Sequence, residues 1–317
     1  MTYASGGLIS ASDYNGLVGA NPSTASGVYN TVWATGNGDR GYGQSPLSQA
    51  ASVGADITAT QWTTFINAIN NLTTHQTGSS AGLSTVGFGS LITYDSALTT
   101  ALTNLYTYRL AHAANGTNSP GSVFSPGFSV GNTYAAQDFS FTRTITWASA
   151  DACRYFYNAG GYLNFVTTSA VNNDGSTRSA DWCTLVGTNI GNITGIGAYT
   201  NSGRSGTGGT LSVGSPNTGL GYWNSSTTYQ TLIQVTSTGY TYTGDYALIQ
   251  IKNSAANAGS NADNGYVQYI YGYLYSAAHD SIHQWNQTIN MTWNHRIDVV
   301  YPSTTYLTNT WYSPTIT

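Results

Sequence analysis

The sequence contains no glutamate, and Lys252 is its single lysine. Charged residues make up only 6% of the chain, whereas an ordinary globular domain carries about 25%. Glutamate and lysine normally cover the exposed faces of helices and gain little from strand geometry, so their absence favours β-structure. Their place is taken by glycine, threonine, serine, asparagine and tyrosine. We therefore expect a folded protein with a neutral surface rich in hydroxyl and amide groups.

Positive charge is scarce as well. The eight arginine and lysine residues are scattered and the net charge is -4, which opposes nucleic-acid binding because phosphates need clustered cations. The sequence has no run of about 20 apolar residues that would span a membrane. Residues 1–7 carry neither a positive charge nor an apolar core, so no secretory signal is expected there. An extracellular type of composition without an export signal fits release by host lysis, as for a viral protein.

Only two cysteines are present, Cys153 and Cys183, which are too few for a disulfide framework. Both fall in segments that we predict to be short helices, where cysteine usually acts as a small buried apolar residue. A disulfide between Cys153 and Cys183 is the alternative. No cofactor is expected.

The first 115 residues carry repeated helix-start signals and are predicted to form a helical docking module. Residues 9–15, Ile-Ser-Ala-Ser-Asp-Tyr-Asn, are echoed by residues 57–63, Ile-Thr-Ala-Thr-Gln-Trp-Thr, and a looser copy begins at Ile92. Each copy has a serine or threonine as its expected N-cap, and the first two have Asp or Gln three residues later, as in a capping box. The glycine-rich stretch 36–44 lacks the Gly-Lys-Ser/Thr ending of a phosphate cradle and is predicted to be a turn-rich connector.

Residues 116–138 are rich in Gly, Ser, Asn and Pro and are predicted to be a linker or extended arm. From Phe139, apolar residues alternate with serine and threonine, as in a half-buried strand. Strand patterns and glycine turns then recur to the last residue, interrupted by short helices. We therefore predict an α+β, mainly β fold, in which the helical module and the linker precede an antiparallel β-sandwich, jelly-roll-like, over residues 139–317.

Several motifs along the chain point to one group of proteins. In the first half they are residues 9–15, Gly41-Tyr42-Gly43-Gln44, residues 57–62 and His75-Gln76. In the second half they are residues 141–147, Ser149-Ala150-Asp151, Arg154-Tyr155-Phe156, Asn158-Ala159-Gly160-Gly161, Trp182 and Tyr301-Pro302. This set resembles the virion structural proteins of tailed bacteriophages, especially cyanophages and other marine phages. The resemblance covers most of the chain and implies a component of a tail, fibre, neck or capsid surface, assembled in the host cytoplasm and present in the virion.

Catalytic residues are not expected. All twelve acidic residues are aspartates, mostly at predicted helix starts or beside glycine or asparagine, where turn chemistry explains them. A carboxylate pair of the glycosidase type is the alternative. The densest titratable cluster, His279, Asp280 and His283 with His295 on the following strand, is a metal-site hypothesis. The interpretation that we favour is a polar loop, with His295 facing solvent or a neighbouring chain.

A row of tyrosines is the main candidate site. One face of the predicted strand presents Val267, Tyr269, Tyr271, Tyr273 and Tyr275, and the other presents Tyr266, Ile270 and Leu274, which we expect to face the core. Such a row offers flat apolar rings together with hydroxyl groups, which suits a subunit interface or a platform for glycans. A second sheet that covers the row is the structural alternative.

These features predict a non-enzymatic phage virion structural protein. It would act by self-association, as a trimer or another homo-oligomer, and by docking onto other virion proteins through its N-terminal module. Such contacts would resist salt, because few ion pairs are involved. Two rivals stay open: an adhesin that binds a host receptor or surface glycan through the tyrosine-rich domain, and a tail-associated polysaccharide hydrolase.

Overall fold

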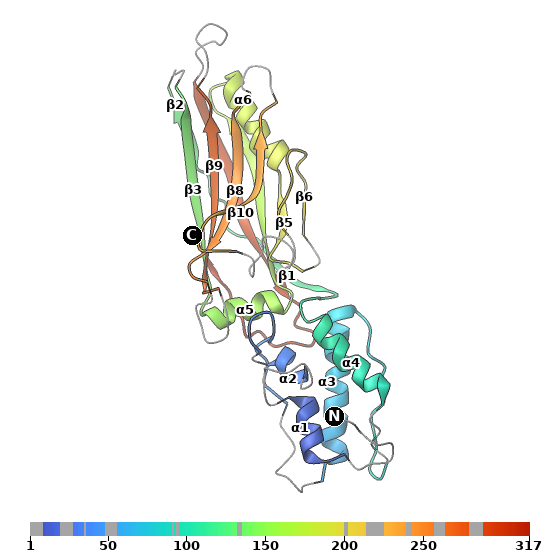
Figure 1. The fold of residues 1–317 in the computed structure, drawn as a ribbon. Coiled ribbons are helices and arrows are strands. Elements are labelled where there is room, and N and C mark those ends of the chain that lie inside the picture. Colours follow the sequence, from blue (N-terminus) through green and yellow to red (C-terminus); the bar gives the residue numbers. More distant parts are fainter. Residues whose placement is uncertain are drawn as a thin grey trace.

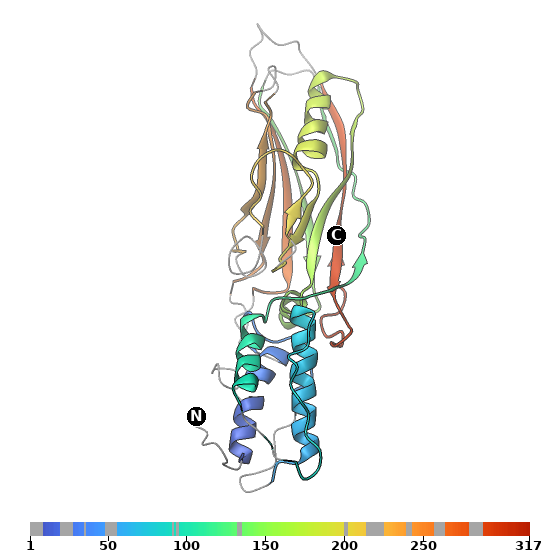
Figure 2. The same cartoon turned by 90° about the vertical axis from the view of Figure 1, so that its right-hand side faces the viewer.

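The computed structural model is an elongated body with a helical module at one end and a β-sandwich at the other (Figures 1 and 2). It describes residues 9–19, 28–34, 36–47, 56–90, 92, 95–131, 135–199, 202–213, 225–238, 243–256, 264–278 and 288–317. Within these ranges, helices and two antiparallel sheets confirm the predicted α+β, mainly β fold. No helix of these ranges is long and apolar enough to cross a membrane.

The helical module contains α1 (Ala11–Val18), α2 (Val28–Trp33), α3 (Ala59–Thr77) and α4 (Ser96–Thr107). The two predicted capping boxes are confirmed, since Ser10 pairs with Asp13 before α1 and Thr58 pairs with Gln61 before α3. Helix α4 differs from the expected pattern. Its N-cap is Asp95, whose carboxylate accepts a hydrogen bond from the backbone amide of Leu98 at 3.0 Å, rather than a serine or threonine.

The core of the module is made by the apolar faces of its four helices. The buried residues are Tyr14, Leu17 and Val18 of α1, Tyr29 and Val32 of α2, Trp62, Phe65, Ile66, Ile69 and Leu72 of α3, and Leu98, Ala101, Leu102 and Leu105 of α4. Full burial of one large apolar side chain stabilises a fold by about 1.5–3 kcal/mol. These buried residues recur at every third or fourth position along each helix, so they form the face through which the helices pack.

The sandwich consists of one sheet with the order β1-β10-β4-β5-β6, in which β2 also pairs with β10, and one with the order β11-β3-β9-β8-β7. The strands are β1 (Asn115–Ser119), β2 (Gly127–Val130), β3 (Gln137–Thr146), β4 (Tyr162–Asn172), β5 (Ile193–Ile196), β6 (Gly203–Arg204), β7 (Gln230–Thr236), β8 (Tyr246–Asn253), β9 (Val267–Ser276), β10 (Ile289–Pro302) and β11 (Thr315–Ile316). Helix α6 (Thr177–Thr184) and the π-helical turn η1 (Leu185–Ile190) lie between the sheets at the end away from the module (Figure 2).

The segment predicted to be a linker or extended arm, residues 116–138, contributes edge strands to the sandwich. β1 and β2 both pair antiparallel with β10, and Asn118 lies opposite Val300. This pairing satisfies amide and carbonyl groups that an open strand edge would leave exposed. A glycine permits the close approach, because a Cβ atom at Gly121 would lie 2.2 Å from the carbonyl oxygen of Ile297. The segment therefore binds along the sandwich instead of separating two bodies.

The interior of the sandwich is aromatic, and His295 of β10 lies inside it. The imidazole is fully buried, and its ring centroid lies 4.2 Å from that of Phe141 and 5.0 Å from that of Phe165. Burial lowers the pKa of His295 to about 4, so the ring is neutral at pH 7. The expectation that His295 faces solvent or a neighbouring chain was wrong. His295 lies two residues from both Trp293 and Ile297, so its side chain points to the same, inward face of β10, and all three are buried.

We expect the protein to lose stability between pH 6.5 and about pH 4, and His295→Phe to reduce that loss. The unfolded histidine takes up a proton near pH 6.5, whereas the folded ring does so only near pH 4. Acid therefore favours unfolding, by up to about 3 kcal/mol for such a residue, and phenylalanine removes the titration while preserving the aromatic contacts. Urea denaturation at about pH 7.5 and about pH 4.5 measures the difference. An equal acid loss in wild type and variant would contradict the assignment.

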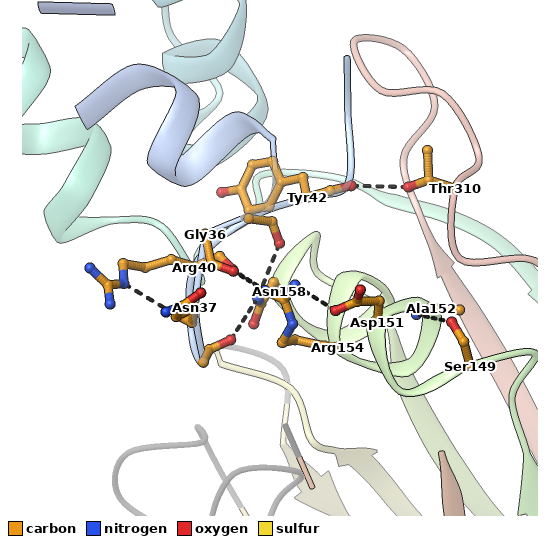
Figure 3. Close-up of polar contacts among 12 residues, drawn as sticks. Gly36, Asn37, Arg40, Tyr42, Ser149, Asp151, Ala152, Arg154, Asn158 and Thr310 are labelled. Carbon is orange, nitrogen blue, oxygen red and sulfur yellow. Dashed lines mark hydrogen bonds and ion pairs between the residues drawn. The ribbon is translucent and has the colours of Figure 1, made fainter. Parts of the chain in front are cut away.

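Helix α5 (Ala150–Asn158) joins the helical module to the sandwich through its buried Arg154 (Figure 3). The guanidinium of Arg154 donates hydrogen bonds to the backbone carbonyl oxygens of Gly36 and Arg40 in the glycine-rich loop. It also pairs with the carboxylate of Asp151 at 2.8 Å. A buried cation requires such acceptors, because its removal from water is costly. Arg154 therefore fixes the loop against α5.

The same loop is held at further points. Asn158 donates to the carbonyl oxygens of Gly38 and Gly41, at 3.1 Å in each case. Next in the chain, Gln44 accepts from the amide of Thr308 at 2.8 Å and donates to the carbonyl oxygen of the same residue at 2.9 Å. The stretch predicted from the sequence to be a turn-rich connector is thus held between α5 and the segment after β10, where the helical module contacts the sandwich.

We expect Arg154→Leu to destabilise the protein by about 3 kcal/mol or more, because it leaves buried carbonyl oxygens without a donor. The midpoint of urea denaturation measures the loss. Lys252→Leu is the matched control: Lys252 is only partly buried and lies over the rings of Tyr229 and Tyr269, and since such contacts contribute about 0.5–1 kcal/mol at exposed sites, its loss should cost about 1 kcal/mol or less. Equal effects of the two substitutions would contradict a special role for Arg154.

Candidate functional site

The outward face of the β11-β3-β9-β8-β7 sheet carries the tyrosine row. Tyr269, Tyr271, Tyr273 and Tyr275 alternate along β9 with fully buried residues such as Ile270 and Leu274, and each tyrosine keeps part of its surface in solvent. The predicted alternation is therefore confirmed, and no sheet formed by the described residues covers the row. Tyr266 is the exception. It was expected in the core but is 48% exposed, because β9 begins one residue later and Tyr266 lies outside the regular pleat.

Two tyrosines that sequence reasoning missed extend the row sideways. Tyr246 of β8 lies directly opposite Tyr275 of β9, with 5.0 Å between their ring centroids. The ring centroid of Tyr229, just before β7, lies 5.0 Å from that of Tyr271. The alternation in β8 was visible in the sequence, but which residue lies opposite Tyr275 depends on the register between strands. We call the six residues Tyr229, Tyr246, Tyr269, Tyr271, Tyr273 and Tyr275 the tyrosine face.

Polar groups surround the tyrosine face on both sides. Along β3, Asp138, Ser140, Thr142 and Thr144 lie opposite Tyr275, Tyr273, Tyr271 and Tyr269 in that order. On the β8 side, the ammonium of Lys252 lies 4.4 Å from the ring centroid of Tyr229 and 5.1 Å from that of Tyr269. Such a cation–π contact contributes about 0.5–1 kcal/mol at an exposed site. The face thus combines aromatic rings with hydroxyl groups and carries one charge at either end.

The hydroxyl group of Tyr273 stays protonated at neutral pH. Partial desolvation, followed by the negative charge of Asp138, raises the pKa of Tyr273 to about 12. A neutral phenol both donates and accepts a hydrogen bond, whereas a phenolate only accepts. The tyrosine face therefore provides both kinds of hydrogen-bonding group over a largely apolar surface, and chemistry of this kind suits binding better than proton transfer.

The metal-site hypothesis receives no support from the residues that can be placed. His279, Asp280 and His283 lie outside the described residues, and His295 is buried among aromatic rings. Over the described ranges, no three His, Cys or Asp side chains gather as metal ligands would. The disulfide hypothesis was wrong. Cys153 in α5 and Cys183 in α6 form no disulfide, and these helices lie at opposite ends of the sandwich (Figure 1).

One pair of aspartates comes close enough for their charges to interact. Burial, together with the charge of Asp245, raises the pKa of Asp181. Asp245 is fully buried, and its carboxylate accepts hydrogen bonds from the indole of Trp182 at 3.0 Å and from the amide of Ala277 at 2.8 Å. The hydrogen bond to Trp182 attaches α6 to Asp245, which explains the buried carboxylate by a structural role. Because Asp245 is fully buried, a sugar could not reach it.

A second exposed feature lies at the free end of the helical module. Phe88 stands in a turn and is fully solvent-exposed. Its place follows from two contacts of α3: Thr63 near the start of the helix donates to the carbonyl oxygen of Val86 at 2.9 Å, whereas His75 near the end contacts Ala159 beside the sandwich. Phe88, two residues after Val86, is therefore remote from the sandwich. Sequence reasoning missed it, although its two flanking glycines mark an exposed turn.

Comparison of the chain with protein families, with curated proteins and with solved structures found no match.

The tyrosine face should contribute little to folding. We expect Tyr271→Ser to change the free energy of unfolding by less than about 1 kcal/mol, because the ring lies on the outward face of the sheet and keeps part of its surface in solvent. Leu274→Ser, three residues along the same strand, should cost about 3 kcal/mol or more, because this side chain is fully buried. Urea denaturation of the two variants provides the comparison. A loss from Tyr271→Ser as large as that from Leu274→Ser would mean that the face serves the fold and not binding.

Proposed function

We propose that this chain is a non-enzymatic structural component of a tailed-phage virion, which docks onto the particle through its helical module and self-associates through the tyrosine face. The observation that carries the proposal is the separation of two exposed aromatic features at different ends of one molecule. Phe88 lies at the free end of the module, and the tyrosine face lies on the sandwich. The motif resemblance to phage virion structural proteins supports the same conclusion.

The bonded junction supports an architectural role. Arg154, Asn158 and Gln44 bind the glycine-rich loop and the segment after β10 at the same point of the molecule. Such contacts favour a constant distance between the docking end and the far end, whereas enzymes that close over substrates use hinges.

The docking contact that we propose is apolar. An exposed phenylalanine in a turn can insert into a hydrophobic pocket of another virion protein, and such anchors dominate the free energy of many interfaces. The module surface around it carries few charges, in keeping with the chain's 6% of charged residues. Attachment of this kind depends little on ionic strength.

A host-directed adhesin is the second candidate function. The combination of aromatic rings and hydroxyl groups on the tyrosine face also fits a neutral glycan. A hydrolase has less support, since the interacting aspartate pair found among the described residues, Asp181 and Asp245, includes a fully buried carboxylate.

Immunogold electron microscopy of purified particles, with antibody raised against residues 139–317, tests the proposal. Gold at a fixed place on the particle is the expected result. Protein that is abundant in the lysate but absent from particles would contradict a virion role and favour a free lectin or a hydrolase.

Phe88→Ser tests the docking end. We expect it to lower the amount of the protein in particles by roughly tenfold or more, because a hot-spot anchor contributes about 2 kcal/mol or more. Quantitative mass spectrometry of purified particles provides the measurement. Val171→Ser, which removes a 41% exposed apolar side chain from the sandwich, is the control and should leave incorporation unchanged. Equal incorporation of both variants would place the docking surface elsewhere.

A further inference from the structure

The tyrosine face carries two opposite charges at diagonal corners. The five strands of its sheet, all of whose residues are described, contain three charged residues: Asp138, Arg143 and Lys252. Arg143 points inward and is buried. Asp138 of β3 lies opposite Tyr275 at one end of β9, and Lys252 of β8 lies opposite Tyr269 at the other end. The two charges are separated by six residues, or about 20 Å, along the strands, and by two strand spacings, or about 10 Å, across them.

This arrangement is complementary to itself. A two-fold axis that lies in the plane of the face and is perpendicular to the line from Lys252 to Asp138 exchanges the two corners. Two copies packed face to face around that axis bring each Lys252 opposite the partner's Asp138. In an isologous interface every such contact occurs twice. The two pairs of opposite charge would fix the register of the tyrosine rings between them.

We propose that the tyrosine face binds the same face of a second copy of this chain around this diagonal axis. The line from Lys252 to Asp138 is inclined by roughly 27° to the strands, so the strands of the two copies cross at roughly 50° from antiparallel. The inference deepens the self-association of the proposed function and rests on it. The strictly antiparallel and the parallel alternatives both lack charge pairing. A two-fold axis across β9 would place Lys252 opposite Tyr246, and Asp138 opposite Thr144. A two-fold axis along β9 would place Lys252 opposite Thr144, and Asp138 opposite Tyr246, because these are the residues at the mirrored corners.

The size and the chemistry of the face fit such a dimer. Strands β3, β9, β8 and β7 contain ten, ten, eight and seven residues, so their outward face covers roughly 550 Å² per copy. Full overlap would bury about 1,100 Å² in total, and the crossing of the strands reduces this to roughly 900 Å², which is the range of a weak specific interface. Tyrosine is enriched at such interfaces, and the hydroxyl groups on β3 provide hydrogen-bonding partners.

Charge exchange tests the geometry. The dimer dissociation constant of the full chain is measured by sedimentation velocity for wild type, Lys252→Asp, Asp138→Lys and the double variant. Each single substitution puts like charges opposite each other twice and should weaken the dimer roughly tenfold or more, whereas the double variant should return to within about threefold of wild type. Asp56→Lys changes the net charge by the same amount as Asp138→Lys at an exposed position of the helical module, and should have no effect. Circular dichroism confirms that each variant is folded.

Three outcomes would overturn the inference. The first is a wild-type chain that stays monomeric at about 100 μM, a concentration at which even a weak specific pair associates. The second is a double variant that dimerises no better than the single ones. The third is a monomer that is retained on a column of neutral polysaccharide and loses retention on Tyr271→Ser, which would assign the face to a glycan. All three are independent of the immunogold result, so a chain located in the virion but monomeric in solution would remove this inference and leave the docking role intact.

Discussion

The arrangement of the molecule depends on the buried guanidinium of Arg154. Arginine cannot lose its charge in a protein, so once α5 carries it into the interior it must find acceptors there. It finds them in the backbone of the glycine-rich loop, more than a hundred residues earlier in the chain. Glycine is needed in that loop because carbonyl groups and rings approach closely: at Gly43, with a φ of 71°, a Cβ atom would lie 2.3 Å from the ring of Tyr155. The charge thereby ties the helical module to the sandwich.

The low charge of the chain explains how the rest of the structure is held together. The interior of the sandwich uses aromatic contacts, and even His295 takes part as a neutral ring between Phe141 and Phe165. The surface uses hydroxyl and amide groups where most proteins place Glu and Lys. On the tyrosine face, therefore, a single lysine and a single exposed aspartate decide the electrostatics, and a two-fold arrangement is the simplest one that pairs both. A protein with an ordinary density of surface charge would not define its partner geometry in this way.

The candidate site was only partly visible in the sequence. The period of two in residues 267–275 predicts correctly that the tyrosines share one face and that Ile270 and Leu274 face inward. It could not show that Tyr246 and Tyr229 join the row, because that depends on which residues of β8 and of the segment before β7 lie opposite β9. The alternation along β10 likewise indicated that His295 points inward, because it lies two residues from Trp293 and therefore on the same face of the strand. Its polar side chain suggested a loop or surface role instead, since a polar residue inside a sandwich is the exception.

The sequence by itself determined the mainly β class, the helix starts at Ser10 and Thr58, and the direction of each tyrosine along β9. All of these follow from the residue types at neighbouring positions, two to four residues apart, so local chemistry is sufficient to specify them. Only the tertiary structure decided that β1 and β2 pair with β10, that the glycine-rich loop receives Arg154, and that Lys252 and Asp138 lie at opposite corners of one face. Each of these depends on strand register or on a buried charge finding distant acceptors, and such contacts join segments whose separation along the chain carries no local signal.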